Sequence, residues 1–236
     1  MTTSSVLPVF LASLVLLVGA TAEGASPEER VDRRTQDALA LDAHPLRGAD
    51  AYRHYCSQCH GARALGNAQK EVPALAGQRY AYLIRQLANF AGSERDNSQM
   101  HAVTTRPELR RPQMWVDIAS YLNSLPTRAP LTTGPGDDVA LGRGIFQEQC
   151  ASCHGSDAGG DADGFVPSLR HQHYRYLGEQ MHKLAEGYRH NVDESLMLFL
   201  RSFDDRDIGA TADYLSRLEG AGQDRKKMRD DGVVVD

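Results

Sequence analysis

The sequence predicts an all-α chain made of two similar helical units joined by an extended connector. Three observations support this prediction. Apolar residues recur at helical spacing, the pattern repeats after 94 residues without a gap, and proline and glycine are concentrated between the two copies. No segment shows a convincing two-residue alternation, which is the pattern of half-buried strands. A length of 236 residues is enough for two small domains.

The first 22 residues have the pattern of an export signal. They contain no charged side chain, and an apolar run over residues 6–18 is followed by small residues up to Ala22. We predict cleavage after Ala22. Retention as an anchor is the alternative, although the run is shorter than the roughly 20 apolar residues of a bilayer span. The expected location is therefore the periplasm, either free or peripheral to the membrane. Residues 23–47 form an N-terminal extension, in which Glu28 to Leu41 fits one polar helix.

The two units are copies of one another. When Cys56 is placed over Cys150, the same shift aligns many identical residues. The aligned pairs include Gly48/Gly142, Cys59/Cys153, His60/His154, Gly66/Gly160, Pro73/Pro167, Gln78/Gln172, Tyr82/Tyr176, Gln86/Gln180, Arg95/Arg189 and Asn97/Asn191. So many matches indicate a duplicated unit. The resulting boundaries are 48–126 for the first domain, 127–138 for the linker, 139–220 for the second domain and 221–236 for a flexible tail.

Each unit is expected to hold about three main helices. In the first, helical spacing is found just before Cys56, from Tyr80 to Phe90 and from Trp115 to Leu125. The equivalent segments of the second unit contain Ile145 and Phe146, then Tyr174 to Leu184, then Ile208 to Leu218. Glycine- and proline-rich loops separate these segments, which favours two small helical domains.

Both units contain the motif Cys-x-x-Cys-His. Its residues are Cys56, Cys59 and His60 in the first unit, and Cys150, Cys153 and His154 in the second. This is the attachment signature of c-type haem. Two thiols three residues apart on a helical turn can each bond one vinyl group of the porphyrin, and the next residue then places its imidazole on the iron. The sequence therefore predicts two covalently bound haems, with His60 and His154 as axial ligands.

Other uses of paired cysteines fit this pattern less well. A redox pair does not need the histidine and is expected after a strand. A zinc site built from both pairs needs them roughly 15–20 residues apart, whereas here more than 90 residues separate them. Two structural disulfides remain compatible with export, but a bridge within Cys-x-x-Cys is usually redox-active.

Further contacts with each haem are indicated by the repeat. Pro73 and Pro167 each follow their motif histidine by 13 residues. A loop at this spacing can present the carbonyl that accepts the second N–H of the ring, and an ordinary loop proline is the alternative. Arg95 and Arg189 fit either a charge-assisted contact with the haem propionates or a surface role.

A sixth ligand for each iron must come from further along the chain. In the first unit the candidates are Met100, His101 and Met114, and we favour Met100 because it follows the middle helix in a polar loop. In the second unit Met197 is the only methionine of the matching loop, whereas Met181 belongs to the middle helix. Methionine ligation favours ferrous iron and raises its potential, and a six-coordinate iron transfers electrons without binding a substrate.

These residues resemble the dihaem cytochrome c4 family. The resemblance rests on the two motif units, on the stretch VPALAGQRYAYLIRQLANF with its echo VPSLRHQHYRYLGEQMHKL, and on the loops RDNSQM and RHNVDESLM. It covers roughly residues 48–218. It implies two class I cytochrome c domains related by a pseudo-twofold axis, with haem propionates near the domain interface. It also implies ligation by His60/Met100 and His154/Met197.

The expected function is electron transfer between redox proteins, not catalysis. The resemblance implies a reductase or dehydrogenase as donor and a terminal oxidase or another respiratory enzyme as acceptor, and membrane association through such a partner stays open. Two alternatives also stay open: a cytochrome subunit of a dehydrogenase complex, of the sulfide dehydrogenase kind, and a dihaem enzyme such as a peroxidase. A net charge of −5 argues against nucleic acid as a partner. Together with four propionates, it predicts that at least one partner presents basic residues.

Overall fold

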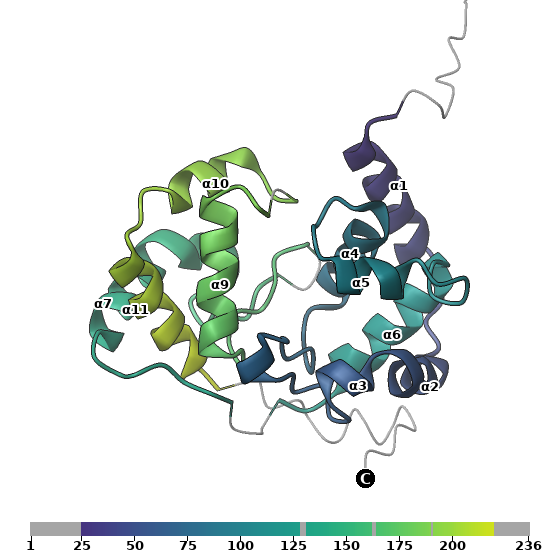
Figure 1. Cartoon of the computed structure of the whole chain (residues 1–236), viewed down its shortest axis with the longest axis horizontal. Helices are drawn as coiled ribbons and strands as arrows, with labels where there is room; N and C mark the ends of the chain where they lie inside the picture. Colours follow the sequence, from purple (N-terminus) through teal and green to yellow (C-terminus); the bar gives the residue numbers. More distant parts are fainter. Residues whose placement is uncertain (1–24, 128–130, 162–163, 190, 220–236) are drawn as a thin grey trace, which may run out of the picture.

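The protein is all-α in the part of the chain that the computed structural model describes, which confirms the predicted fold class. The described residues are 25–127, 131–161, 164–189 and 191–219. The predicted signal and tail lie outside them. Two groups of helices lie side by side (Figure 1). Outside the helices, the described residues contain one isolated bridge, between Asn67 and Val72. None of the described helices is long and apolar enough to cross a membrane.

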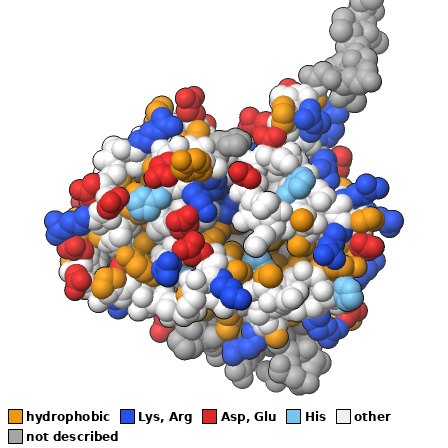
Figure 2. All heavy atoms as spheres, in the orientation of Figure 1, with side chains coloured by type: hydrophobic (Ala, Val, Ile, Leu, Met, Phe, Trp, Pro, Cys, Tyr) orange, Lys and Arg blue, Asp and Glu red, His pale blue; other side chains and the backbone are white. Residues whose placement is uncertain are grey.

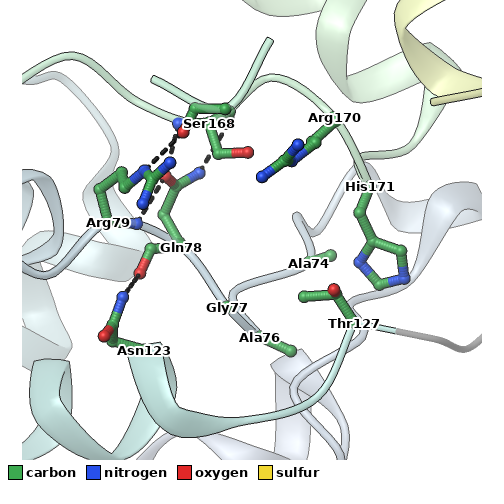
Figure 3. A pocket seen from close by; sticks show the side chains of 11 residues that line it. Ala74, Ala76, Gly77, Gln78, Arg79, Asn123, Thr127, Ser168, Arg170 and His171 are labelled. Carbon is green, nitrogen blue, oxygen red and sulfur yellow. Dashed lines mark hydrogen bonds between the residues drawn. The ribbon is translucent and has the colours of Figure 1, made fainter. Parts of the chain in front are cut away.

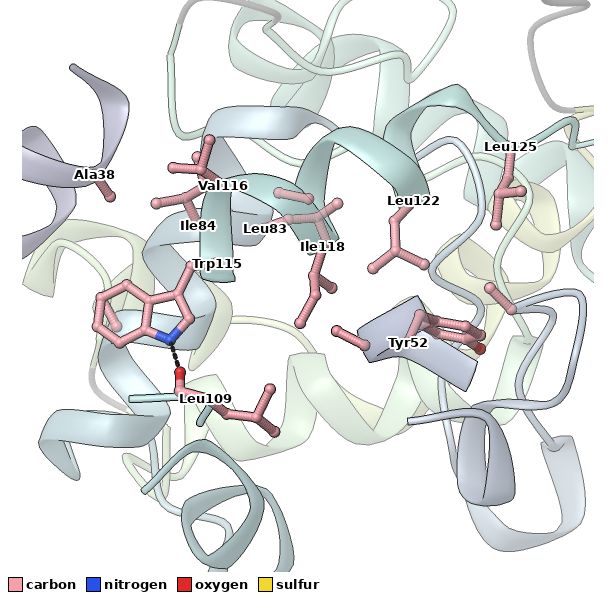
Figure 4. Close-up of a cluster of buried hydrophobic side chains, with 14 of the residues drawn as sticks. Ala38, Tyr52, Leu83, Ile84, Leu109, Trp115, Val116, Ile118, Leu122 and Leu125 are labelled. Carbon is pink, nitrogen blue, oxygen red and sulfur yellow. Dashed lines mark hydrogen bonds between the residues drawn. The ribbon is translucent and has the colours of Figure 1, made fainter. Parts of the chain in front are cut away.

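The first domain is built around three long helices. Its elements are α2 (Pro45–Tyr55), α3 (Ser57–His60), the 3-10 turn η2 (Ala68–Lys70), α4 (Tyr80–Gly92), α5 (Ser98–Thr104) and α6 (Pro112–Ser124). Helices α2 and α6 begin at proline, whose fixed φ suits a first turn and whose missing N–H is not needed there. Tyr52, Ile84, Trp115 and Val116 form the centre of the core, and the Trp115 indole donates to the Leu109 carbonyl at 2.7 Å (Figure 4).

The second domain repeats this arrangement. Its elements are α7 (Val139–Ile145), the π-helical turn η3 (Phe146–Cys150), α8 (Ala151–His154), α9 (Tyr174–Ala185), α10 (Glu194–Leu200) and α11 (Asp205–Ser216). Its core is a cluster of buried residues, namely Phe146, Ala158, Leu177, Ala212 and Leu215. Each main helix of the first domain therefore has a counterpart in the second, as the repeat predicts.

The helix that precedes each motif crosses the last helix of its domain at very short range. A Cβ atom on Gly48 would lie 2.0 Å from the carbonyl oxygen of Asp117, and one on Gly142 would lie 1.9 Å from that of Ala210. Only glycine allows this approach. The crossing is the same in both copies, so it fixes the direction in which each motif leaves its helix.

The N-terminal extension forms helix α1 (Pro27–Leu39), close to the expected polar helix. It is not a separate appendage, because Val31 and Ala38 are buried against the first domain, where α1 contacts α4 and α6. Asp32 also forms an ion pair with Arg85 of α4 at 2.7 Å. The sequence did not indicate this buried face because it consists of a few small side chains.

The described part of the linker lies along the second domain. The Gly136 amide donates to the buried Asp213 carboxylate at 2.6 Å, and Arg217 donates to the Gly134 carbonyl at 2.8 Å. Asp213 lies in the last turn of α11, and Arg217 follows directly after that helix. The connector therefore packs against the second domain instead of spanning solvent.

The two domains meet through contacts that obey an approximate twofold symmetry. The Gln78 amide donates to the Ser168 carbonyl at 2.9 Å and accepts from the Ser168 N–H at 2.8 Å (Figure 3). Gln172 forms the same two bonds with Ala74, both at 2.9 Å. The 94-residue repeat aligns Gln78 with Gln172 and Ala74 with Ser168. The duplicated sequence thus produces an interface in which each copy offers the other the same surface.

Candidate haem-attachment sites

The first motif forms one helical turn directly after α2. Cys56 is half-buried and Cys59 is exposed, and the His60 amide donates to the Cys56 carbonyl at 3.0 Å. The His60 ring is buried, and its Nδ1 lies 3.1 Å from the carbonyl oxygen of Pro73. Because a carbonyl only accepts, Nδ1 carries the proton and Nε2 keeps its lone pair for a metal. Burial also lowers the pKa of the ring, which favours the neutral, ligating form.

The second motif has the same geometry. Cys150 is half-buried, Cys153 is exposed, and Nδ1 of His154 lies 3.1 Å from the carbonyl oxygen of Pro167. Burial lowers the pKa of this ring as well. Each proline loop therefore meets the motif histidine of its own domain, which leaves Nε2 of both rings available to an iron.

A glycine in each unit lets the proline loop close on its histidine. Gly66 has a φ of +73°, and a Cβ atom there would lie 2.3 Å from the Val72 carbonyl oxygen. Its amide donates to the His60 carbonyl at 2.9 Å. Gly160 repeats these features, with a φ of +71° and a bond of 2.8 Å to the His154 carbonyl. The glycine thus joins the motif and the proline loop into one structural unit.

The cysteines have the chemistry that haem attachment needs. None of the four cysteines is part of a disulfide. Burial, with a smaller effect of the neighbouring cysteine, raises the pKa of Cys56 to about 12 and that of Cys150 to about 11. Redox-active cysteines and metal thiolates have a lowered pKa instead. Among the described residues, no group of three or more His, Cys, Asp or Glu is placed to hold a metal ion. The donor set therefore fits thioether bonds to a porphyrin.

The two favoured methionines lie in short helices, not in the loops that the sequence indicated. Met100 belongs to α5 and Met197 to α10, and both are half-buried. Neither belongs to the hydrophobic clusters of the described residues, whereas Met114 and Met181 pack against those clusters. Met114 and Met181 therefore contribute to the cores.

The Nδ1 atom of His101 contacts the end of α4. Its Nδ1 lies 2.8 Å from the Phe90 carbonyl oxygen and 3.2 Å from the Ser93 hydroxyl. The ring therefore donates to the end of α4, and this contact anchors α5 beside it.

Several interface residues were not singled out for a role by their sequence alone. Gln78, Gln172, Tyr82 and Tyr176 were visible only as identities in the repeat. Their partners in the other domain lie 81 to 107 residues away in the chain. Arg95 and Arg189, whose role the sequence left open, are buried between the domains and not on the surface.

Comparison with known proteins points to one family. The family model for cytochrome c matches residues 46–126 and again 139–219. A thiosulfate dehydrogenase electron acceptor from Stutzerimonas stutzeri is 31% identical over 182 residues, which cover 72% of this chain and 82% of that protein. Cytochrome c4 from Pseudomonas aeruginosa is 28% identical over 192 residues, which cover 76% and 92% of the two chains.

Solved structures show the same fold. Reduced recombinant cytochrome c4 from Pseudomonas stutzeri has a TM-score of 0.63 and 22% identity, over 75% of this chain and 100% of that one. The thiosulfate dehydrogenase TsdBA from Marichromatium purpuratum has a TM-score of 0.63 and 26% identity, over 75% of this chain and 40% of that one. The matches and the two attachment motifs establish that the chain carries two covalently bound c-type haems, at Cys56/Cys59 and at Cys150/Cys153.

Proposed function

The chain belongs to the dihaem cytochrome c4 family of electron-transfer cytochromes, and on this premise we propose that it is a periplasmic carrier between a dehydrogenase and a terminal oxidase. The observation that carries the proposal is the repeated site. Both domains hold a motif histidine by Nδ1 and leave Nε2 for an iron. When bound, the haems supply two one-electron Fe(II)/Fe(III) couples.

His60 and His154 would hold the two irons through Nε2. The carbonyl oxygens of Pro73 and Pro167 fix the orientation of each ring and increase the basicity of its Nε2. These carbonyls lie in loops tied to the motif through a glycine, so the ring cannot rotate without moving the loop.

Met100 and Met197 would supply the second protein ligand of each iron. Their half-buried positions outside the apolar clusters support this assignment. A thioether favours ferrous iron. A histidine and a methionine on each iron would leave no position for a substrate, which fits outer-sphere electron transfer.

The partners are redox proteins, and the names of relatives support a dehydrogenase on one side and an oxidase on the other. One relative is named for accepting electrons from thiosulfate dehydrogenase. Another is the FixP subunit of a cbb3-type cytochrome c oxidase from Rhizobium meliloti, 28% identical over 127 residues that cover 52% of this chain and 43% of that one. The periplasmic location is supported by the export pattern of residues 1–22.

The two domains differ in charge, which suits two different partners. Residues 48–126 contain nine Lys and Arg against six Asp and Glu, whereas residues 139–220 contain eight against thirteen. Figure 2 shows Lys and Arg side chains along the outer edge of the first domain, on the right of the view. Complementary charge steers docking. The second domain is therefore the docking site for the more basic partner, and the first for the more acidic one.

Native size-exclusion chromatography of the protein from its own cells tests the carrier function. We expect a single chain with two haems that elutes alone, and reduction by a dehydrogenase that slows as salt is added. Elution in a stable complex with a dehydrogenase would favour the second candidate, a permanent subunit. That candidate is supported by the similarity to thiosulfate dehydrogenase TsdBA, in which this chain spans 40% of the length.

A further inference from the structure

Helix α1 contacts both ends of the segment that carries the methionine proposed as ligand of the first iron. This methionine segment, residues 93–111, connects α4 to α6. At its start, α1 lies so close to the last turn of α4 that a Cβ atom on Gly92 would be 2.9 Å from Cγ2 of Val31. At its end, an Nη2–H of Arg34 donates to the Arg110 carbonyl at 3.2 Å. One helix of the N-terminal extension therefore touches the segment where it begins and where it ends.

Arg34 is built into the end of the methionine segment. Its guanidinium carbon lies 4.6 Å from the centre of the Trp115 ring, within the range of a cation–π contact. The Trp115 indole donates to the Leu109 carbonyl at 2.7 Å (Figure 4), directly before the carbonyl that Arg34 binds. The Arg34 side chain is half-buried, and burial lowers its pKa. Two side chains in contact thus hold two consecutive carbonyls, those of Leu109 and Arg110, just before α6.

Helix α1 is itself fixed to the first domain, so it can support the methionine segment. Val31, Thr35 and Ala38 follow helical spacing and form one buried stripe. This helix packs on α4 and α6, and Asp32 adds an ion pair with Arg85 of α4 at 2.7 Å. Movement of α1 away from the segment would therefore separate a buried face and break an ion pair.

Contacts inside the methionine segment link its ends to Met100. The Met100 amide donates at 2.9 Å to Oδ1 of Asn97, which caps α5. The buried Thr104 hydroxyl donates to the Met100 carbonyl at 2.9 Å. Nδ1 of His101 lies 2.8 Å from the Phe90 carbonyl oxygen of α4. Because these bonds join Met100 to its neighbours and to α4, a displacement of the segment also moves Met100.

The second domain holds its corresponding segment in a different way. Residues 186–204 connect α9 to α11. They are bridged from within, because Nε–H of Arg201 donates to the Ala185 carbonyl at 2.8 Å, at an exposed position. The element that precedes α7 is the linker, whose Gly136 amide contacts Asp213 of α11. Among the described helices, α1 therefore has no counterpart in this domain.

We propose that α1 is a clamp for the methionine segment, and that Arg34 is the positioning residue through which it keeps Met100 on the first iron. This inference rests on the proposed ligation of that iron by Met100. A ligand leaves its iron when the segment that carries it opens locally, and such an opening costs the contacts that it breaks. The ferric state is the sensitive one, because a thioether favours ferrous iron. The clamp therefore protects the first iron from competing ligands while it is oxidised.

Displacement of methionine by imidazole from the oxidised dihaem protein tests the clamp. In a Met197→Ala background, the ferric methionine charge-transfer band comes from Met100 alone. We expect Arg34→Leu, which has no donor and no charge, to lower the imidazole concentration at half loss of the band by about tenfold, as for a lost hydrogen bond and cation–π contact. Arg34→Lys should retain part of the resistance. Arg33→Leu is the matched control, because Arg33 is the exposed neighbour on the same helix, and it should leave the midpoint unchanged.

The clamp is overturned if Arg34→Leu shifts the Met100 midpoint no more than Arg33→Leu does. It is also overturned if, in a Met100→Ala background, Arg34→Leu weakens the band of Met197 equally, because the effect would then be a general loss of stability. Where Arg34→Leu is poorly folded, the two single-methionine proteins are compared. Met100 should resist imidazole more than Met197, and an equal or reversed order overturns the clamp.

The same titration separates the clamp from the ligation on which it rests. Absence of the band from the Met197→Ala protein would overturn ligation by Met100, and the clamp with it. A band that is present but insensitive to Arg34 overturns the clamp alone.

Discussion

Gln172 and Ala74 exchange two hydrogen bonds across the domain interface. The side-chain Nε2 of Gln172 donates to the Ala74 carbonyl at 2.9 Å, and its Oε1 accepts from the Ala74 N–H at 2.9 Å. The Gln172 side chain thus pairs with the backbone of Ala74 through the two hydrogen bonds that a neighbouring β-strand would otherwise make. Gln78 does the same for Ser168, so the interface contains two equivalent amide contacts.

Replacement of Gln172 by alanine should weaken the interface. It leaves two buried backbone groups of Ala74 without a partner, at a cost of about 2 kcal/mol in the free energy of unfolding. Urea denaturation measures this change. Gln147→Ala is the control, because Gln147 is exposed and its bond to Ser156 lies on the surface. An equal loss in the free energy of unfolding for both variants would mean that the Gln172 amide contributes no more to stability than a hydrogen bond on the surface.

The interface should also loosen in acid through His173. Its Nε2 lies 2.8 Å from the Leu65 carbonyl of the first domain, its Nδ1 lies 2.9 Å from the Thr132 hydroxyl, and burial lowers its pKa. The folded protein therefore prefers the neutral ring. The contribution to stability is complete above the unfolded pKa of about 6.5 and is lost as the pH falls through that value toward the folded pKa.

Unfolding by urea between pH 8 and pH 5 measures this effect. The wild type should lose more stability over this range than His173→Gln, which cannot titrate at this position. His54→Gln, at an exposed position, should keep the wild-type dependence. Identical pH profiles for the wild type and His173→Gln would show that protonation of this ring does not weaken the interface.

The helix crossing beside the first motif should not tolerate a methyl group. In Gly48→Ala, the new Cβ would lie 2.0 Å from the Asp117 carbonyl oxygen, so α2 must move away from α6. We expect a loss of about 3 kcal/mol, at the upper end for overpacking. Gly144→Ala is the matched control, because nothing lies within 4 Å of its Cβ, and alanine there should stabilise α7 by roughly 0.5 kcal/mol. Thermal unfolding distinguishes the two, and equal midpoints would contradict the crossing.

Removal of the Met100 thioether should open the first iron. Met100→Ala is expected to lower the potential of one haem and to allow carbon monoxide to bind to about half of the reduced haem, because ferrous iron loses its sulfur ligand. Met114→Leu keeps a side chain of similar volume in the core and should change neither property. If Met100→Ala behaves like Met114→Leu, then His101 is the better candidate.

The helices of both domains could be predicted from the sequence because their apolar residues keep helical spacing over three turns or more, as from Tyr80 to Phe90. The short helices α5 and α10 could not. Each has seven residues, and each begins at a polar side chain that caps it, Asn97 or Asp193. Such helices depend on local hydrogen bonds and leave no periodic pattern. The domain boundaries at 48–126 and 139–220 remain predictions.

The motif residues of the candidate site could be predicted because their chemistry depends on spacing within five residues. The interface could not, because it depends on how one copy of the unit is placed on the other. Tyr82 contacts Arg189 across 107 residues, and neither side chain has a sequence pattern that selects a partner. The repeat shows that both copies carry this tyrosine and this arginine at equivalent positions. Only the folded structure shows that the tyrosine of one copy contacts the arginine of the other.

The most direct test of the account is an optical spectrum of the purified protein, oxidised and reduced, with and without carbon monoxide, together with a haem count per chain. The account predicts two haems, a methionine–iron charge-transfer band in the ferric form at full intensity for both, and no change with carbon monoxide. One haem per chain, half of the methionine band, or a carbon monoxide shift would contradict a closed dihaem carrier with Met100 and Met197 as ligands.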